Sequence, residues 1–103
     1  MGYYTDYKLS MNNADTEDKV MIKESLTEIS GYSWYDYFEL NDVKWYSHHE
    51  DMLEVSKKFP HVEFTLSGDG EEKGDNWIVI YKDGKHKRYE PEVIWPEINF
   101  NDL

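Results

Sequence analysis

The dipeptide Asp83-Gly84 constrains this chain more than any other feature of its sequence. It separates two runs, "WIVIYK" and "KHKRYE", the first of which is rich in the β-branched and aromatic residues that favour strands. Two strands joined by Asp-Gly predict a hairpin with a type I′ turn, because glycine and aspartate tolerate the positive φ which that turn needs. The predicted register pairs Ile78 with Tyr89 and Val79 with Arg88. The fold must therefore accommodate this antiparallel pair.

Four other segments are predicted as strands. Residues 3–11 and 62–66 alternate between apolar and polar side chains, which is typical of a strand with one buried face. Residues 32–40 and 43–46 are dense in aromatic residues that favour strands. The dipeptide Asn41-Asp42 between them is predicted to form a turn.

Two helices are also predicted. The first has Asp15 or Thr16 as its N-cap and ends at Gly31, which suits the left-handed position after a helix. The second is predicted to begin with a capping box, in which Ser47 and Glu50 each bond the free backbone N–H of the other. The apolar stripes of the two helices consist of Ile22, Leu26 and Ile29 in the first, and Met52, Val55, Ser56 and Phe59 in the second.

This order of elements predicts an α+β fold in a single domain over residues 1–103. We expect a two-layer sandwich with both helices on one face of a mainly antiparallel sheet of four to six strands, either ferredoxin-like or a variant of it. The other face of the sheet is expected to carry Tyr, Trp and Lys side chains. Such a face would be an open aromatic surface or a surface for self-association.

The charge of the chain limits its partners. Acidic residues number 22 against 11 basic ones, which gives a formal charge of −11, while 17% of the residues are aromatic and argue against disorder. This charge opposes direct binding to nucleic acid or to an anionic membrane and favours a partner with a basic surface. No apolar run approaches the ~20 residues that span a bilayer. There is no cysteine, and we expect a cytoplasmic protein.

The stretch "LSGDGEEKGDNW" at residues 66–77 is open to several interpretations. An EF-hand starting at Asp69 would put Lys73 and Ile80 at ligand positions that need oxygen, so that motif is excluded. Its carboxylates would repel a phosphate. A plain loop between strands, a looser divalent-metal site and a partner-binding loop remain. The acidic residues of the stretch are Asp69, Glu71, Glu72 and Asp75.

Two further clusters carry chemistry. "HHED" at residues 48–51 combines His48, His49 and Asp51, which could bind zinc or relay protons, although a helix start explains much of the cluster. "KDGKHKR" at residues 82–88 is a basic patch around the predicted hairpin turn. Lysines on an edge strand also prevent aggregation of sheets, so this patch does not by itself indicate nucleic-acid binding.

The segments "GYYTDYKL" and "KWYSHHEDMLEVSKKFPHVEFTLSGDGEEKGDNW", followed by "YKDGK", resemble a set of small proteins of bacteria and their tailed phages. The shared features are a GYYT start, a KWY before an acidic helix, and a GxGEExGDxW loop, over residues 2–11 and 44–85. The resemblance implies a phage or prophage setting and an α+β domain. It brings no catalytic residues to this chain.

Together these observations predict a non-enzymatic interaction protein that acts on a host protein with a basic surface, in one form as an acidic mimic of DNA. The residues predicted to bind the partner are Asp69, Glu71, Glu72, Asp75 and Trp77, with Glu50, Asp51 and Glu54 on the second helix. No catalytic residue, cofactor or metal is predicted. Two alternatives are a metal-dependent enzyme using the "HHED" cluster with the acidic loop, and a homo-oligomeric accessory protein.

Overall fold

A computed structural model gives the fold, and it describes residues 4–35, 37–70 and 76–89. Tyr3 of the first predicted strand and the tail from residue 90 lie outside these ranges. The elements in chain order are β1 (Thr5–Asn12), α1 (Thr16–Ser30), β2 (Glu39–Val43), α2 (His48–Lys58), β3 (Glu63–Gly70), β4 (Asn76–Lys82) and β5 (Lys85–Tyr89).

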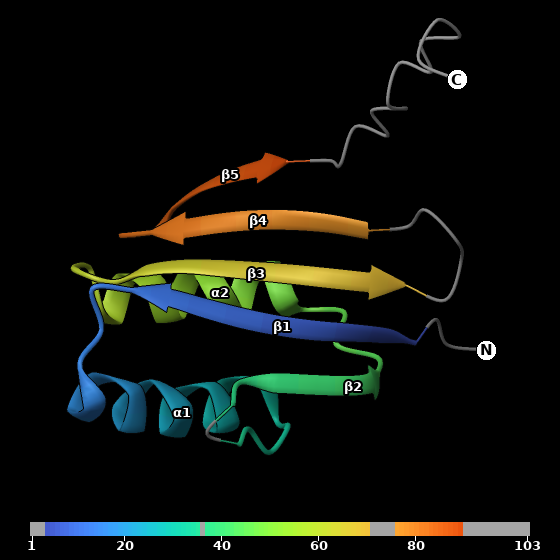
Figure 1. Cartoon of the computed structure of the whole chain (residues 1–103), viewed down its shortest axis with the longest axis horizontal. Coiled ribbons are helices and arrows are strands. Elements are labelled where there is room, and N and C mark those ends of the chain that lie inside the picture. Colours follow the sequence, from blue (N-terminus) through green and yellow to red (C-terminus); the bar gives the residue numbers. More distant parts are fainter. Residues whose placement is uncertain (1–3, 36, 71–75, 90–103) are drawn as a thin grey trace, which may run out of the picture.

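The five strands form one open sheet in the order β2-β1-β3-β4-β5, and every neighbouring pair is antiparallel. Both helices lie on the same side of it, with α2 passing behind β3, while α1 lies below the left half of β1 and in line with β2 (Figure 1). The predicted α+β sandwich is therefore confirmed. The fold is a variant rather than ferredoxin-like itself, because α2 follows β2 directly and the last three strands are consecutive.

The hairpin has the register that its turn predicts. Ile78 pairs with Tyr89 and Val79 with Arg88, and both turn residues have positive φ, 49° at Asp83 and 74° at Gly84. Positive φ at both central positions is the geometry of a type I′ turn. The last strand, β5, is consequently an edge strand of the sheet.

Helix α1 begins and ends as predicted. The side chain of Asp15 accepts from the backbone N–H of Asp18, and the Asp18 carboxylate accepts from the backbone N–H of Asp15, which closes a capping box. Gly31 follows the helix with φ 79°, the left-handed conformation that glycine adopts without strain. Ile22 and Leu26 are fully buried and anchor the helix to the core.

The capping box predicted for α2 is wrong. Ser47 is the N-cap, but it makes no side-chain bond to the helix backbone, because its ψ of 18° is far from the extended geometry of a capping residue. Its hydroxyl donates instead to the Asp51 carboxylate, with an Oγ–Oδ2 distance of 2.8 Å. The apolar face of α2 is as predicted, since Met52, Val55 and Ser56 are fully buried.

The aromatic region before α2 differs from its prediction. Among its described residues the one strand is β2, which begins at Glu39, and residues 32–35 and 44–46 are not strands. Asn41-Asp42 lies inside β2 and does not form a turn between two strands. The register against β1 shifts here, with Tyr7 opposite Leu40 and Thr5 opposite Val43, so the extra residue forms a bulge.

The core lies between the sheet and the helices and is unusually aromatic. Trp34, Trp45 and Trp77 are all buried on the helix side, which corrects the expectation that Trp side chains lie on the other face. The open face of the sheet is mainly polar, with Ile78 and Tyr89 as its exposed large apolar residues. The exposed aromatic side chains elsewhere are Tyr4, Tyr35, Tyr37 and Tyr46.

Candidate functional site

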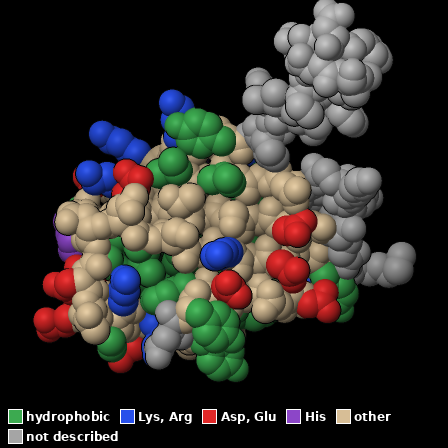
Figure 2. All heavy atoms as spheres, in the orientation of Figure 1, with side chains coloured by type: hydrophobic (Ala, Val, Ile, Leu, Met, Phe, Trp, Pro, Cys, Tyr) green, Lys and Arg blue, Asp and Glu red, His purple; other side chains and the backbone are tan. Residues whose placement is uncertain are grey.

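Two carboxylates face each other on the open face of the sheet. Asp6 of β1 and Asp69 of β3 are direct register partners, and both side chains are exposed. Within residues 4–35, 37–70 and 76–89, neither carboxylate forms an ion pair with a basic side chain. Acidic side chains gather at this end of the face, next to the ends of β1 and β3 (Figure 2). Like charges opposite each other destabilise a sheet, and at Asp6 a hydrogen bond from the backbone N–H of Asp42 offsets part of this cost.

A third acidic residue, Asp42, lies next to Asp6 at the bulge in β2. Asp42 has φ 57°, a left-handed conformation that aspartate tolerates better than most residues. Its backbone N–H donates to the Asp6 carboxylate, with an N–Oδ1 distance of 2.7 Å. The bulge therefore brings the backbone of Asp42, an exposed residue of the edge strand, into contact with Asp6. We call Asp6, Asp42 and Asp69 the acidic patch.

A shallow concavity adjoins the acidic patch between β3 and β4. It has a volume of about 290 Å³ and is lined by Ser67, Gly68, Asp69, Asn76, Trp77 and Ile78. It combines one carboxylate with polar groups and the apolar surface of Ile78. These are the surroundings that suit a Lys or Arg side chain, whose stem is apolar and whose head is charged.

Of the residues predicted to bind the partner from this stretch, the structure places Asp69 in the acidic patch, whereas Trp77 is buried on the helix side of the sheet and does not belong to that surface. Strand β3 continues from Ser67 to Gly70, beyond the end of the predicted strand at residue 66. The connection between β3 and β4 is therefore shorter than predicted. The Trp77 indole is buried and packs flat on Gly68, where a Cβ atom would overlap the ring. Glu71, Glu72 and Asp75 lie outside the described residues.

The residues predicted on α2 belong to the other layer of the molecule and do not join the acidic patch. Glu50 and Glu54 are exposed on the helix. Asp51 has an internal role, since its Oδ2 accepts from the indole Nε1 of Trp45 at 2.7 Å as well as from Ser47. Asp51 thus holds the residues before α2 against the helix.

The two histidines of "HHED" are partly buried and held by aromatic rings. The ring of His48 stacks on Trp77, with 4.8 Å between centroids and 20° between planes. Burial lowers the pKa of His48, because it disfavours the charged form of the ring. The Nδ1 atom of His49 is 3.0 Å from the hydroxyl of Tyr81. Asp51 is not part of a metal site with them, and no group of three metal-ligating side chains occurs in the part of the chain that the structure describes.

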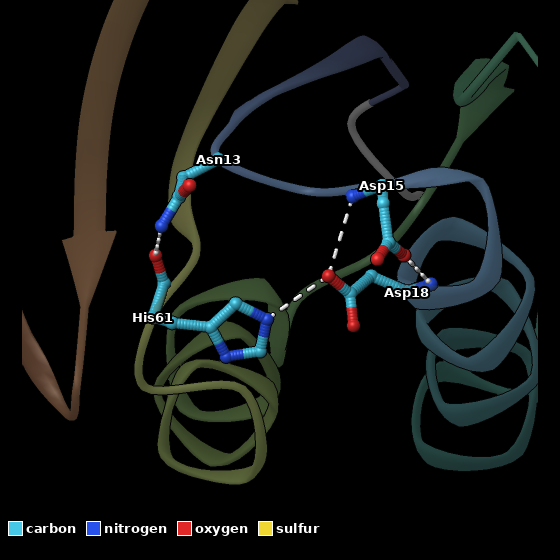
Figure 3. Close-up of polar contacts among 4 residues, drawn as sticks. All are labelled: Asn13, Asp15, Asp18 and His61. Atoms are coloured by element: carbon cyan, nitrogen blue, oxygen red, sulfur yellow. Dashed lines mark hydrogen bonds and ion pairs between the residues drawn. The ribbon is translucent and has the colours of Figure 1, made fainter.

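Another polar cluster, at the start of α1, has a structural role (Figure 3). Nε2 of His61, which precedes β3, is 3.0 Å from Oδ2 of Asp18, and the side chain of Asn13 donates to the backbone carbonyl of His61 at 2.9 Å. The bond from His61 lowers the pKa of Asp18. These contacts join the β1–α1 connection to the α2–β3 connection beside an open depression of about 520 Å³.

The comparisons with known proteins do not add an identity to this geometry. No family model, curated protein or solved structure matches the chain. Among the described residues, no helix is both long and apolar enough to cross a membrane. Sequence reasoning missed Asp6 and Asp42, because the only signal for them was the alternation of β1 and an Asn-Asp pair that was interpreted as a turn.

Proposed function

We propose that this protein is a non-enzymatic interaction module that binds a basic surface of another protein through the acidic patch. The observation that carries the proposal is the direct pairing of Asp6 and Asp69 on an exposed face. Because like charges in register oppose folding, their placement is best explained by a cationic partner that neutralises them on binding. Asp42, which is exposed and whose backbone N–H bonds the Asp6 carboxylate, is a third acidic residue at this end of the sheet.

The concavity next to Asp69 gives this binding a specific form. A Lys or Arg side chain of the partner would place its head on the Asp69 carboxylate and its stem against Ile78. Three more acidic residues, Glu71, Glu72 and Asp75, follow Asp69 in the sequence and add to the negative charge available. A total charge of −11 would in addition speed the encounter with a basic partner.

The resemblance to proteins of bacteria and tailed phages supports a bacterial host protein as the partner. In the narrower form of the proposal, the patch imitates the phosphates of DNA and occupies the basic groove of a nucleic-acid-binding enzyme. Duplex DNA would then compete with this protein for the partner, whereas a partner with an ordinary basic surface would bind regardless of added DNA.

The first test is capture of proteins from a bacterial lysate at about 0.05 M and at about 0.5 M salt, since higher salt screens charges more than a few ångströms apart. The captured protein is then titrated with the Asp6→Asn/Asp69→Asn variant. The matched control is Glu24→Gln/Glu28→Gln, which removes the same charge from exposed positions of α1.

We expect capture at low salt only, with affinity reduced about tenfold in the patch variant and less than about twofold in the control. Equal losses in the two variants would show that only total charge matters, and would overturn the assignment of the patch. Capture of nothing at low salt would overturn the proposed function itself.

A further inference from the structure

A second pocket lies on the opposite side of the sheet from the acidic patch. It has a volume of about 240 Å³ and is bounded by the start of α2 and by strands β4 and β5. Four of its lining side chains carry nitrogen hydrogen-bonding groups, and one is apolar. They are His48, His49, His86, Arg88 and Val79. We call this the histidine–arginine pocket.

The rings of the pocket are held in fixed orientations. His48 is stacked on Trp77 and also meets the edge of Trp45, with 6.0 Å between centroids and 72° between planes. The ring centroids of His49 and His86 are 4.5 Å apart, and the planes of the two rings meet at 88°. The Arg88 guanidinium lies 5.7 Å from the centre of the Trp77 ring. The donors are therefore largely positioned before any ligand arrives, which lowers the entropy lost on binding.

The fold does not use all of the hydrogen-bonding capacity of these rings. Nδ1 of His48 is buried and has no partner among the described residues. Buried polar groups are normally bonded, so each exception needs an explanation, of which a missing ligand is one. The Tyr81 hydroxyl can donate to or accept from Nδ1 of His49, depending on the tautomer of the ring.

The cation that lines this pocket is Arg88. It is on the helix side of β5, opposite Val79, whereas Lys85 and Lys87 of the same strand are on the open face. His48 and His49 are the first two residues of α2, where free backbone N–H groups and the helix dipole favour an anion. Among the described residues, the carboxylates at the start of α2 are Glu50, which is exposed, and Asp51, which is bonded to Trp45 and Ser47.

We propose that the histidine–arginine pocket binds an oxyanion, a phosphate or carboxylate group carried by a small molecule. The Arg88 guanidinium offers a planar pair of N–H donors that matches both groups, and the imidazoles of His49 and His86 supply further donors from either side. The volume is below that of sites for drug-sized ligands, so it suits one such group with a short substituent against Val79. A metal ion fits less well, because Arg88 would repel it.

The proposal is tested by titrating the whole protein with inorganic phosphate and, separately, with acetate, following the imidazole and Val79 signals by NMR. Arg88→Gln removes the guanidinium from the pocket, whereas Lys87→Gln removes one positive charge from the same strand on the opposite face of the sheet. Thermal unfolding of both variants checks that each is folded. The patch variant Asp6→Asn/Asp69→Asn serves as a second control.

We expect saturable shifts of the pocket signals with at least one anion, an affinity reduced about tenfold in Arg88→Gln, and a change below about twofold in Lys87→Gln. The anion that binds more tightly identifies the group. Absence of saturation with both anions below about 10 mM would overturn the proposal, and so would equal losses in the two variants. The Asp6→Asn/Asp69→Asn variant is expected to bind the anion at least as well, which separates this site from the proposed protein interface.

Discussion

The hydroxyl of Ser56 joins helix α2 to the turn of the β4–β5 hairpin by accepting a hydrogen bond from the backbone N–H of Gly84, with an N–Oγ distance of 2.9 Å. The same hydroxyl donates to the backbone carbonyl of Leu53, also at 2.9 Å, and Ser56 is fully buried. This contact holds the edge strand β5 against the helix. Because His86 and Arg88 are on β5, it also positions one side of the histidine–arginine pocket.

Replacing Ser56 with alanine should destabilise the protein by about 1–3 kcal/mol, because the partly buried N–H of Gly84 would lose its partner. Urea unfolding followed by Trp fluorescence measures the change. Ser10→Ala is the control, since Ser10 is exposed on the open face of β1, and it should change the stability by less than about 0.5 kcal/mol. Similar values for the two variants would show that the bond contributes little.

Local patterns were sufficient to predict much of this fold. The Asp83-Gly84 turn specifies its own register because the two strands are adjacent in the chain. Helix α1 was predictable from its capping residues, because these too bond backbone groups that are close to them in the chain. The acidic patch was not, because it depends on the register between β1 and β3, which are far apart in sequence, and on a bulge in β2. No short-range rule places Asp6 opposite Asp69.

For the histidine–arginine pocket too, local sequence patterns predicted one part, and long-range packing determined the rest. The "HHED" run was recognised as a cluster with chemistry, but it was interpreted with Asp51 as a partner. The structure instead bonds Asp51 to Trp45 and brings His86 and Arg88 of β5 to the histidines. The basic hairpin and the histidine pair are separate segments of the sequence, and only the packing of β5 on α2 makes them neighbours.

Gly68 is expected to be the most sensitive glycine of the sheet, because the Trp77 indole occupies the space of its side chain. Gly68→Ala should lower the free energy of unfolding by about 1–3 kcal/mol, the usual range for overpacking a filled core. It should also shift the Trp fluorescence, since Trp77 must move. Ser67→Ala, the neighbouring position on the open face, is the control and should do neither.

The like-charge pair of the acidic patch makes a prediction about stability. Asp69→Asn should stabilise the protein by about 0.2–1 kcal/mol at low salt, because it removes the repulsion from Asp6 across the strands. The gain should shrink as salt rises to about 0.5 M, where exposed charges are screened. Urea unfolding at two salt concentrations measures it, and a destabilised variant would show that Asp69 supports the fold rather than opposing it.

The pair of Asp18 and His61 predicts how the fold responds to acid. The bond from His61 holds the pKa of Asp18 below its ordinary value of 3.8, so between the folded and unfolded pKa values the unfolded chain binds more protons. The stabilisation from this pair is therefore present above the unfolded value and is lost as the pH falls through the lower, folded one. Asp18→Asn removes the titrating group, and the variant should lose less stability than the wild type over that window.

The measurement is thermal unfolding from about pH 6 to about pH 2, comparing the wild type with Asp18→Asn, His61→Ala and the double variant. The double variant should resemble Asp18→Asn in its acid dependence, because the carboxylate that titrates is absent from both. His61→Ala should keep part of the dependence, since the Asp18 carboxylate also accepts from the backbone N–H of Asp15. The same loss of stability on acidification in all four proteins would show that this contact does not contribute to the acid response. In that case the join between the β1–α1 and α2–β3 connections would depend on the bond from Asn13 to the carbonyl of His61.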